Sequence, residues 1–385
     1  MASSNKWVPE AIRFGVDRES GAEIEQLTSE PVTSTNIYCE QRFTSADGKR
    51  IAIERKPFGR PAEIWVCDLE TLKICQAVTG TPLGANARLN SVYFIGMQGS
   101  RNCLMALDLQ SLAVRDLFHF YTNEQYPSGA VSPDERWFIT GPVPVRDNIM
   151  GLRRVNLENG RTDMLCEIED MFNPHFQFEP AFGKLSLVQI NRGAKWKSPD
   201  GKQTRTGPLG ATLSLVNVKS GKVTPLPAGR PHTPPITGHE CWAGMTGRIL
   251  FTAGHYSVSA SSFVTLKDDE AARREPPAIY SITPGDASAK VVARGLMFNH
   301  LAASDDCQFF IADDHADGRI YIGNIVTGKY IPLCHSHTRQ GACQFSHVHA
   351  YMTPGNRHVV FNSIATGTGQ VYAARIPEGF LEQIL

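Results

Sequence analysis

The sequence predicts an all-β protein and, more narrowly, a seven-bladed β-propeller. Short apolar runs of roughly four to six residues recur along the chain, and helical periodicity is almost absent. Turns rich in Asp, Gly and Pro separate these runs. The pattern repeats at a spacing of roughly 35 to 65 residues, which is typical of propeller blades. The 385 residues therefore accommodate about seven blades in a single domain, residues 1–385.

Each repeat combines a first apolar run, a turn and two or more further strands. The repeats begin near Tyr38, Ser91, Ala130, His175, His239, His300 and His349. In the first repeat, the turn at residues 45–48 (Ser-Ala-Asp-Gly) is followed by predicted strands at 50–54 and 63–68. The last repeat supplies only three strands. We expect residues 22–28 to add a fourth strand to it, which would close the ring and leave no open sheet edge.

Two charged segments interrupt the repeats, residues 195–208 and residues 258–277. We predict that both are surface loops inserted into the propeller. A two-domain organisation is the alternative, but no linker composition separates two parts of the chain.

Composition excludes several classes of partner. Lys plus Arg number 38, equal to Asp plus Glu, so nothing in the overall charge favours nucleic acid or an anionic membrane. The nine cysteines are an odd number and include no C-x-x-C pair, which indicates free thiols in a reducing compartment. The first residues contain no apolar targeting segment. We therefore expect a cytoplasmic protein.

Aligning the repeats by their turns places histidines at one recurring position. The residue four before the turn is Gln41, Ser128, His175, His239, His300 and His349 in the repeats that can be aligned. The first strand of a propeller blade lines the central channel, so we expect equivalent positions to lie at one depth. The histidines of four consecutive repeats would then be neighbours. Channel histidines that merely hydrogen-bond the backbone are the alternative.

A second cluster of possible metal ligands lies in residues 344–349, Gln-Phe-Ser-His-Val-His. On a strand, His347 and His349 would point to the same face and could bind one ion together. Gln344 is an odd number of residues away and could join them only from a loop or bulge. The alternative is a pair of solvated histidines on an edge strand.

The chain resembles the oligogalacturonate lyases, polysaccharide lyases built on a seven-bladed propeller. The resemblance extends over nearly the whole sequence. Its most specific parts are Gly-His-Glu-Cys-Trp at 238–242, Asn-His-Leu at 299–301, the 344–349 segment and Val-Phe-Asn-Ser at 360–363.

The resemblance implies a Mn²⁺ site and a catalytic base. The implied ligands are His300, Gln344, His347 and His349, and the implied base is His239. Neutral nitrogen and oxygen ligands would also accept other divalent transition metals, and they leave the charge of the ion available to a substrate carboxylate. We therefore expect β-elimination on short uronate-containing oligosaccharides, which gives 4,5-unsaturated uronate products.

One departure from the family concerns the sugar. Thr212 stands where the family has an arginine. Arg192 or Arg205 could reach the same space, although a surface position is the favoured interpretation for each. A lyase for another uronic acid linkage, such as rhamnose–glucuronate or an ulvan-like fragment, is therefore an alternative.

Two further residues are candidates for substrate binding, Gln41 and His175. Gln41 could hold a sugar hydroxyl or satisfy the channel backbone. His175 could be a second proton carrier or a sugar contact, or have a structural role. The expected partner is a small acidic oligosaccharide. A propeller that only binds a sugar or a protein is the alternative from a different functional class.

Overall fold

The computed structural model describes residues 6–120, 128–194, 210–254, 277–338 and 343–385. The two predicted surface loops, at 195–208 and 258–277, lie outside the described residues apart from Pro277. Two compact units make up the chain, residues 1–124 with 300–385 and residues 125–299.

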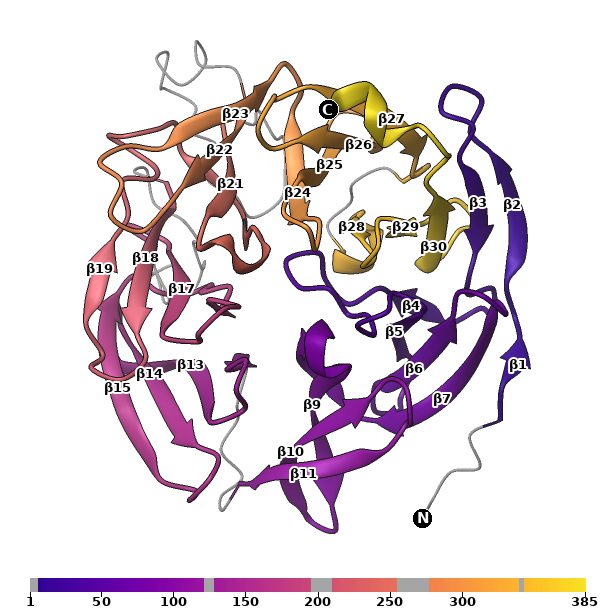
Figure 1. Ribbon diagram of the computed structural model, residues 1–385. Helices are drawn as coiled ribbons and strands as arrows, with labels where there is room; N and C mark the ends of the chain where they lie inside the picture. Colours follow the sequence, from indigo (N-terminus) through magenta and orange to yellow (C-terminus); the bar gives the residue numbers. More distant parts are fainter. Residues whose placement is uncertain (1–5, 121–127, 195–209, 255–276, 339–342) are drawn as a thin grey trace, which may run out of the picture. The chain divides into compact units, whose positions relative to one another are not determined.

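The described residues form seven antiparallel sheets of four or five strands, and the fold is a seven-bladed β-propeller, as predicted. In the five four-stranded sheets, consecutive strands of the chain lie side by side, whereas each five-stranded sheet also pairs strands that are distant in the sequence (Figure 1). Only short 3₁₀ turns, and no α-helix, occur in the described part of the chain; these are η1 (Ala87–Leu89), η2 (Gly244–Thr246), η3 (Gln344–Ser346) and η4 (Leu381–Ile384). None of these turns has the length and hydropathy needed to span a lipid bilayer.

The first unit contains four of the sheets. Their strands are, sheet by sheet, β1 (Val8–Pro9), β4 (Thr33–Thr35), β5 (Arg50–Lys56), β6 (Glu63–Asp68) and β7 (Lys73–Thr79); β8 (Thr81–Asn86), β9 (Ser91–Gln98), β10 (Arg101–Asp108) and β11 (Val114–His119); β24 (Phe298–Ala303), β25 (Phe309–Asp314), β26 (Arg319–Asn324) and β27 (Tyr330–His335); and β2 (Ile12–Val16), β3 (Glu23–Gln26), β28 (Tyr351–Met352), β29 (His358–Ser363) and β30 (Gln370–Arg375).

The second unit contains the other three sheets. Their strands are β12 (Gly129–Val131), β13 (Trp137–Arg146), β14 (Ile149–Asn156) and β15 (Thr162–Glu169); β16 (Gln177–Phe178), β17 (Leu185–Ile190), β18 (Thr212–Asn217) and β19 (Val223–Pro225); and β20 (Ile236–Trp242), β21 (Ile249–Ala253), β22 (Ala278–Ile282) and β23 (Lys290–Arg294).

The last blade takes strands from both ends of the chain. β3 pairs antiparallel with β30, with Glu23 opposite Arg375 and Gln26 opposite Tyr372, so the strand predicted at 22–28 is confirmed. Two further strands were not predicted. β2 extends this sheet beyond β3, and β1 pairs with β7 in the first blade.

The second blade begins earlier than the sequence suggests. The prediction near Ser91 is wrong, because β8 starts at Thr81 and pairs with β9 as an edge strand of this blade. The turn between β8 and β9 is the 3₁₀ turn η1 with a left-handed residue at Asn90, rather than an Asp-Gly turn. It therefore carries no turn sequence of the kind that marks the other repeats.

Five of the six aligned turns share one backbone hydrogen bond, from the N–H of the first turn residue to the carbonyl five residues on. In the first unit Ser45, Ser304 and Thr353 donate this bond over 2.8–2.9 Å. In the second unit Ser132 and Ala243 donate it over 2.8 Å. In the repeat of His175, Glu179 donates instead to the carbonyl of Leu185, six residues on, over 2.9 Å. The other five aligned positions are therefore equivalent within each unit.

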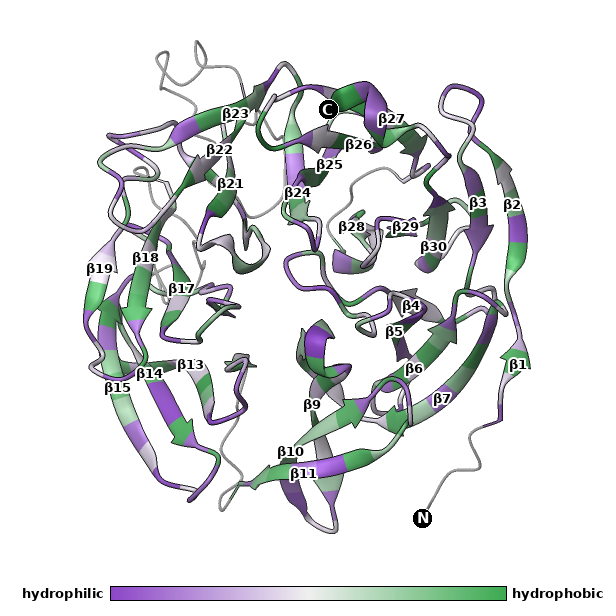
Figure 2. Cartoon of the chain, viewed as in Figure 1, coloured by the Kyte–Doolittle hydropathy of each residue, from purple (hydrophilic) through white to green (hydrophobic). Residues whose placement is uncertain are grey.

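The hydrophobic residues of the blades lie mainly in their strands, as in β6 and β21 (Figure 2). All six residues of β25, Phe-Phe-Ile-Ala-Asp-Asp, are buried. Two carboxylates at the end of a buried strand need specific partners. The nine cysteines are all described, and none forms a disulfide, as expected.

Candidate metal centre

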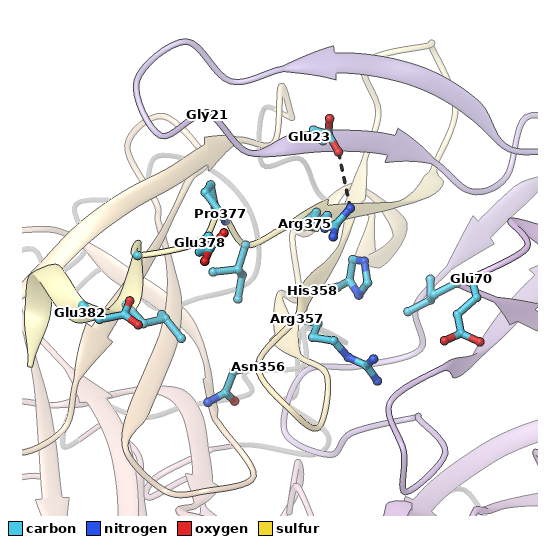
Figure 3. A pocket seen from close by; sticks show the side chains of 14 residues that line it. Gly21, Glu23, Glu70, Asn356, Arg357, His358, Arg375, Pro377, Glu378 and Glu382 are labelled. Atoms are coloured by element: carbon cyan, nitrogen blue, oxygen red, sulfur yellow. Dashed lines mark ion pairs between the residues drawn. The ribbon is translucent and has the colours of Figure 1, made fainter.

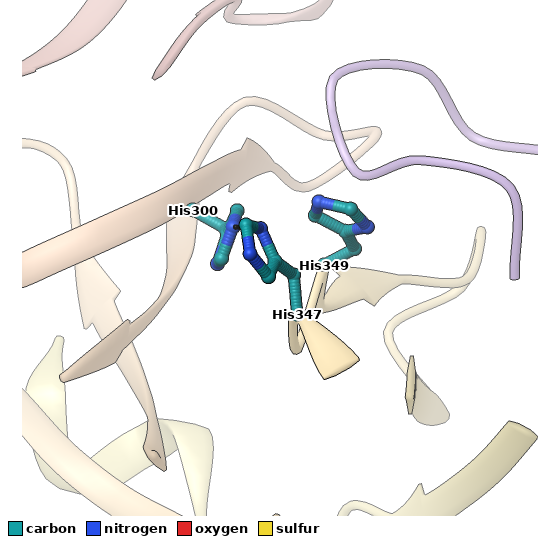
Figure 4. Close-up of side chains that lie close together, drawn as sticks. All are labelled: His300, His347 and His349. Atoms are coloured by element: carbon teal, nitrogen blue, oxygen red, sulfur yellow. Dashed lines mark hydrogen bonds between the residues drawn. The ribbon is translucent and has the colours of Figure 1, made fainter. Parts of the chain in front are cut away.

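Three imidazoles meet in the first unit (Figure 4). His300 comes from β24, and His347 and His349 come from the segment between η3 and β28. Each ring offers a nitrogen, and these nitrogens all lie within 4.8 Å of one another. The structure thus brings together three of the four predicted metal ligands.

The spacing of these nitrogens fits a shared ion. Nε2 of His300 lies 3.3 Å from Nδ1 of His347. An ion about 2.0–2.1 Å from each nitrogen, at tetrahedral or octahedral angles, would place the nitrogens roughly 2.8–3.4 Å apart. The ring centroids of His300 and His349 are 4.5 Å apart and nearly perpendicular, so the third ring approaches from another side.

Asp313 on β25 fixes the orientation of His300. Its Oδ1 atom lies 2.9 Å from Nδ1 of His300 and also accepts the backbone N–H of that residue over 3.0 Å. The ring proton of His300 therefore sits on Nδ1, and the lone pair of Nε2 faces His347. A carboxylate behind a ligating histidine is a common arrangement in metal sites because it sets the tautomer and strengthens the ligand.

Burial keeps His300 neutral. Both side chains of the His300–Asp313 pair are fully buried. Burial first, and then the neighbouring His347 and His315, holds the pKa of His300 well below its ordinary value. Burial also raises the pKa of the Asp313 carboxyl to about 7. His300 is therefore a neutral imidazole, which is the form that binds a metal.

The backbone around His347 and His349 differs from the prediction. These residues do not lie on a strand, since β28 starts only at Tyr351. Side-chain amides hold the segment in place of a β-ladder: Asn362 Nδ2 donates to the carbonyl of His347 over 3.1 Å, and Asn36 Nδ2 donates to that of His349 over 2.7 Å. Both asparagines are fully buried. The two rings therefore converge, but not because they share one face of a strand as predicted.

His349 has a left-handed backbone, with φ of 44°. A non-glycine residue in this region is strained and persists only where its surroundings hold it. Here the carbonyl is bound by Asn36, and the ring packs against Tyr38 with centroids 4.3 Å apart. The left-handed residue turns the chain so that the ring of His349 reaches the other two.

Gln344, the fourth predicted ligand, begins η3 three residues before His347 and is exposed. Its carbonyl accepts the backbone N–H of His347 over 3.1 Å. The turn thus joins the two residues through the backbone, and ligation by the Gln344 side chain stays a prediction.

His239, the predicted base, lies in the second unit at an irregularity of β20. The pairing with β21 shifts register between Ile236 and Glu240, so His239 stands outside the regular ladder. Gly238 before it has φ of 96°, a conformation that favours glycine. Such bulges re-aim side chains and are common beside active sites. Nδ1 of His239 is buried.

His175, in the same unit, is held by two protein groups. Nδ2 of Asn173 lies 2.8 Å from Nε2 of His175, and the carboxylate of Glu240 lies 3.7 Å from its Nδ1. Glu240 is fully buried and was not singled out from the sequence, although it directly follows His239. Gln177 on β16 donates to the carbonyl of Glu240 on β20 over 2.7 Å, which links these two strands. These contacts favour a positioning role for His175.

Gln41 uses its side chain on the backbone. Its Oε1 accepts the N–H of Ala85 on β8 over 2.7 Å. This is the structural alternative considered for Gln41, and it leaves contact with a sugar as a prediction.

Thr212, which stands where the oligogalacturonate lyases have an arginine, has a neutral side chain. The hydroxyl of Thr212 donates to the carbonyl of Ala228 over 2.5 Å. Arg192 donates to the carbonyls of Gly210 and Arg230 over 3.0 and 2.7 Å, and burial, followed by the nearby Arg230, lowers its pKa. Arg205 lies outside the described residues. Arg192 is thus committed to backbone carbonyls near Thr212.

A pocket of about 840 Å³ lies in the last blade, at the end where β29 begins (Figure 3). Arg357 and His358 line it where β29 begins, whereas Asn362, which holds His347, stands near the end of that strand. An ion pair between Arg375 and Glu23, 4.0 Å long, crosses its rim. None of the predicted site residues lines this pocket.

Solved structures of similar fold include two oligogalacturonate lyases. One, in complex with manganese, is 17% identical, with a TM-score of 0.74 over 99% of this chain and 100% of that one. The other, from Vibrio parahaemolyticus, is 16% identical, with a TM-score of 0.72 over 98% and 100%. The fold is that of the oligogalacturonate lyases.

A more distant likeness is to the β-propeller domain of Cps50 (Swd1) from Myceliophteria thermophila, 12% identical, with a TM-score of 0.51 over 90% of this chain and 100% of that one. No protein-family model matches the sequence, and no curated protein does. At these identities the likeness establishes the fold, and the site residues have to be judged by their own geometry.

Proposed function

We propose that this protein is a metal-dependent lyase that cleaves short uronate-containing oligosaccharides by β-elimination. The observation that carries the proposal is the convergence of His300, His347 and His349 with a carboxylate behind one ring. Two buried asparagines and a strained backbone hold these rings in place. Such strain costs free energy and is typical of functional sites rather than of segments with a packing role alone.

We propose Mn²⁺ as the ion, with Gln344 as a fourth ligand. One of the lyases of similar fold is a complex with manganese, and neutral nitrogen and oxygen donors suit this ion. A divalent cation bound there would attract the uronate carboxylate and stabilise the charge that develops when the adjacent C5 loses its proton.

We assign His239 as the base. Because its Nδ1 is buried, the incoming proton would bind to Nε2. The electron pair of the C5–H bond forms a C4–C5 double bond, and the C4–O glycosidic bond breaks. The leaving oxygen takes a proton from solvent. No water adds to the sugar, so the products are an unsaturated uronate and a shortened saccharide.

The neutral Thr212 broadens the range of substrates that we propose. Its hydroxyl is bonded to the backbone and offers no positive charge to a second carboxylate. We therefore include galacturonate, rhamnose–glucuronate and ulvan-like linkages in one substrate class. The nine free thiols support a reducing, cytoplasmic compartment, in which substrates would be short oligosaccharides.

The test is an assay of the purified protein with Mn²⁺ on a panel of uronate oligosaccharides. The expected result is rising ultraviolet absorbance from the new conjugated double bond on at least one member. Cleavage without this absorbance would indicate hydrolysis instead. Saturable binding without any cleavage would indicate a sugar-binding propeller.

The base assignment has its own variants. We expect His239→Ala to lower kcat at least about 100-fold while Mn²⁺ still binds, since general base catalysis commonly contributes this much. His232→Ala is the matched control, because His232 is an exposed histidine of the same unit. Full activity of His239→Ala would sink the assignment and make His175 the next residue to test.

A further inference from the structure

A second cluster of potential metal ligands lies on the outer strands of the second blade, within the first unit. Cys103 belongs to β10, and Asp116 and His119 belong to the edge strand β11. One ligand atom from each residue lies within 4.8 Å of the other two. Neither the fold nor the candidate metal centre of His300, His347 and His349 (the trihistidine centre) explains why these three side chains lie together.

A β-bulge brings the three side chains to one face. Cys103 lies directly opposite His119, and Met105 lies opposite Asp116, with a register shift between Leu104 and Met105. Residues 116 and 119 are an odd number apart and would face opposite sides of a regular strand. The extra residue, Leu117, restores them to the same side, which is how bulges re-aim side chains.

The distance between two of the ligand atoms approaches that of a tetrahedral site. Nε2 of His119 lies 3.6 Å from Oδ2 of Asp116. Two such ligands, each about 2.0–2.2 Å from one zinc ion, would be separated by roughly 3.4 Å. The side chains of His119 and Asp116 are 45% and 37% exposed, so both can rotate toward the sulfur. Cys103 itself is fully buried and fixed by its strand.

A fourth residue orients the carboxylate. Gln98, at the end of β9, donates from Nε2 to Oδ2 of Asp116 over 2.8 Å. Gln98 shares the face of Cys103, because its partner across the hairpin is Arg101, two residues before Cys103. An amide that holds a ligating carboxylate is the kind of outer contact that metal sites use.

We propose that Cys103, Asp116 and His119 form a second metal site, which takes Zn²⁺. Sulfur, imidazole nitrogen and carboxylate oxygen together are the mixed donor set that zinc accepts in tetrahedral geometry. On binding, the Cys103 S–H bond breaks, a Zn–S bond forms, and the proton passes to solvent. Water from the exposed side fills the fourth position.

Sulfur distinguishes this site from the trihistidine centre in a spectroscopic test. The full-length protein is titrated with Co²⁺, a probe for Zn²⁺. The expected result is a sulfur-to-cobalt charge-transfer band in the near ultraviolet, in addition to the visible bands of nitrogen-bound Co²⁺. Titration without a charge-transfer band would overturn the proposal.

Variants locate the band. Cys103→Ser is expected to abolish it, whereas Cys343→Ser should retain it. The second variant is essential, because Cys343 is exposed and directly precedes Gln344, so its thiolate could otherwise report on the trihistidine centre. Loss of the band in Cys343→Ser, or its survival in Cys103→Ser, would contradict the assignment.

Two surface variants keep the test valid if Cys103→Ser fails to fold. His119→Ala and Asp116→Asn should each weaken Zn²⁺ binding at this site by at least about 10–100-fold, the effect of losing even an outer contact. Bound zinc, measured by elemental analysis, should fall by one ion per chain in His119→Ala and stay at the wild-type value in Cys343→Ser. Unchanged zinc content in His119→Ala would overturn the site.

Discussion

Asp313 lies behind His300 and decides which nitrogen of that ring faces the other two imidazoles. We predict that Asp313→Asn lowers the affinity for Mn²⁺ about 10–100-fold, because the amide no longer enforces the correct tautomer or strengthens the ligand. Calorimetric titration with Mn²⁺ measures this change. The matched control is Asp305→Asn, since Asp305 only pairs with Arg42 at the surface over 2.7 Å. Equal affinities of both variants would show that Asp313 merely fills space.

A second prediction at this scale concerns the response of stability to acid. His358 sits beside Arg357 and Arg375, and burial first, then these two charges, lowers its pKa to about 4. Its folded-state pKa is thus below the unfolded value near 6.5, so the unfolded chain binds the proton more readily. Stability from this group is present above pH 6.5 and is lost as the pH falls toward 4.

We therefore expect His358→Gln to lose less stability than the wild type between pH 7 and pH 4. The difference in the free energy of unfolding should be on the order of 2–3 kcal/mol at pH 4, relative to pH 7. Urea unfolding at several pH values gives both curves, and their change with pH cancels any constant packing cost. Parallel curves would mean that the imidazole is not buried as described.

The residues of the candidate centre differ in how far the sequence could predict them. His300, His347 and His349 follow from motif spacing and repeat alignment. The sequence signal for Asp313 is a carboxylate inside a buried strand. Asn36 lies 313 residues before its partner His349, and only the closed sheets bring the two together. Such contacts have no local pattern.

At the scale of elements, Glu10 links the N-terminal strands to the first and last blades. Lying between β1 and β2, its carboxylate accepts bonds from the Arg55 guanidinium and from the backbone N–H groups of Ser29 and Glu30, over 2.7 and 3.1 Å for the latter two. The side chains of Glu10 and Arg55 are only 7% and 4% exposed, and Arg55 also stacks on Trp65. This buried pair joins segments that sequence order keeps apart.

Glu10→Ala should destabilise the protein by roughly 3–5 kcal/mol, because it leaves a buried guanidinium without its carboxylate. Glu19→Ala is the control, since Glu19 pairs with Arg319 at the surface and its loss should cost less than about 1 kcal/mol. Urea denaturation compares the two. Equal, small effects would mean that the N-terminal strands contribute little to stability.

Strands were predictable where a recognisable turn sequence lies beside them. The strand at 63–68 was predicted with its observed bounds, and the N-terminal strand that joins β30 was predicted to within two residues at either end. β8 escaped prediction because a 3₁₀ turn follows it, and β1 because it has only two residues. The bulge that carries His239 depends on pairing with β21, so only the sheet reveals it.

At the scale of the whole molecule, the same fold occurs at low sequence identity. TM-scores of 0.72–0.74 to two lyases accompany identities of only 16–17%. Repeated apolar runs and turns are sufficient to specify seven sheets, so the blade pattern predicted the fold. The sugar is a different matter, because specificity depends on single side chains such as Thr212 that blade packing does not constrain.

The central claim is that a metal at His300, His347 and His349 is required for β-elimination. The most direct test titrates metal-stripped protein with Mn²⁺ while bound metal and the rate of unsaturated product are measured together. We predict that the rate rises in proportion to occupancy of this centre and is lost in His347→Ala. Full activity of the metal-free protein, or no unsaturated product from any uronate at full occupancy, would contradict it.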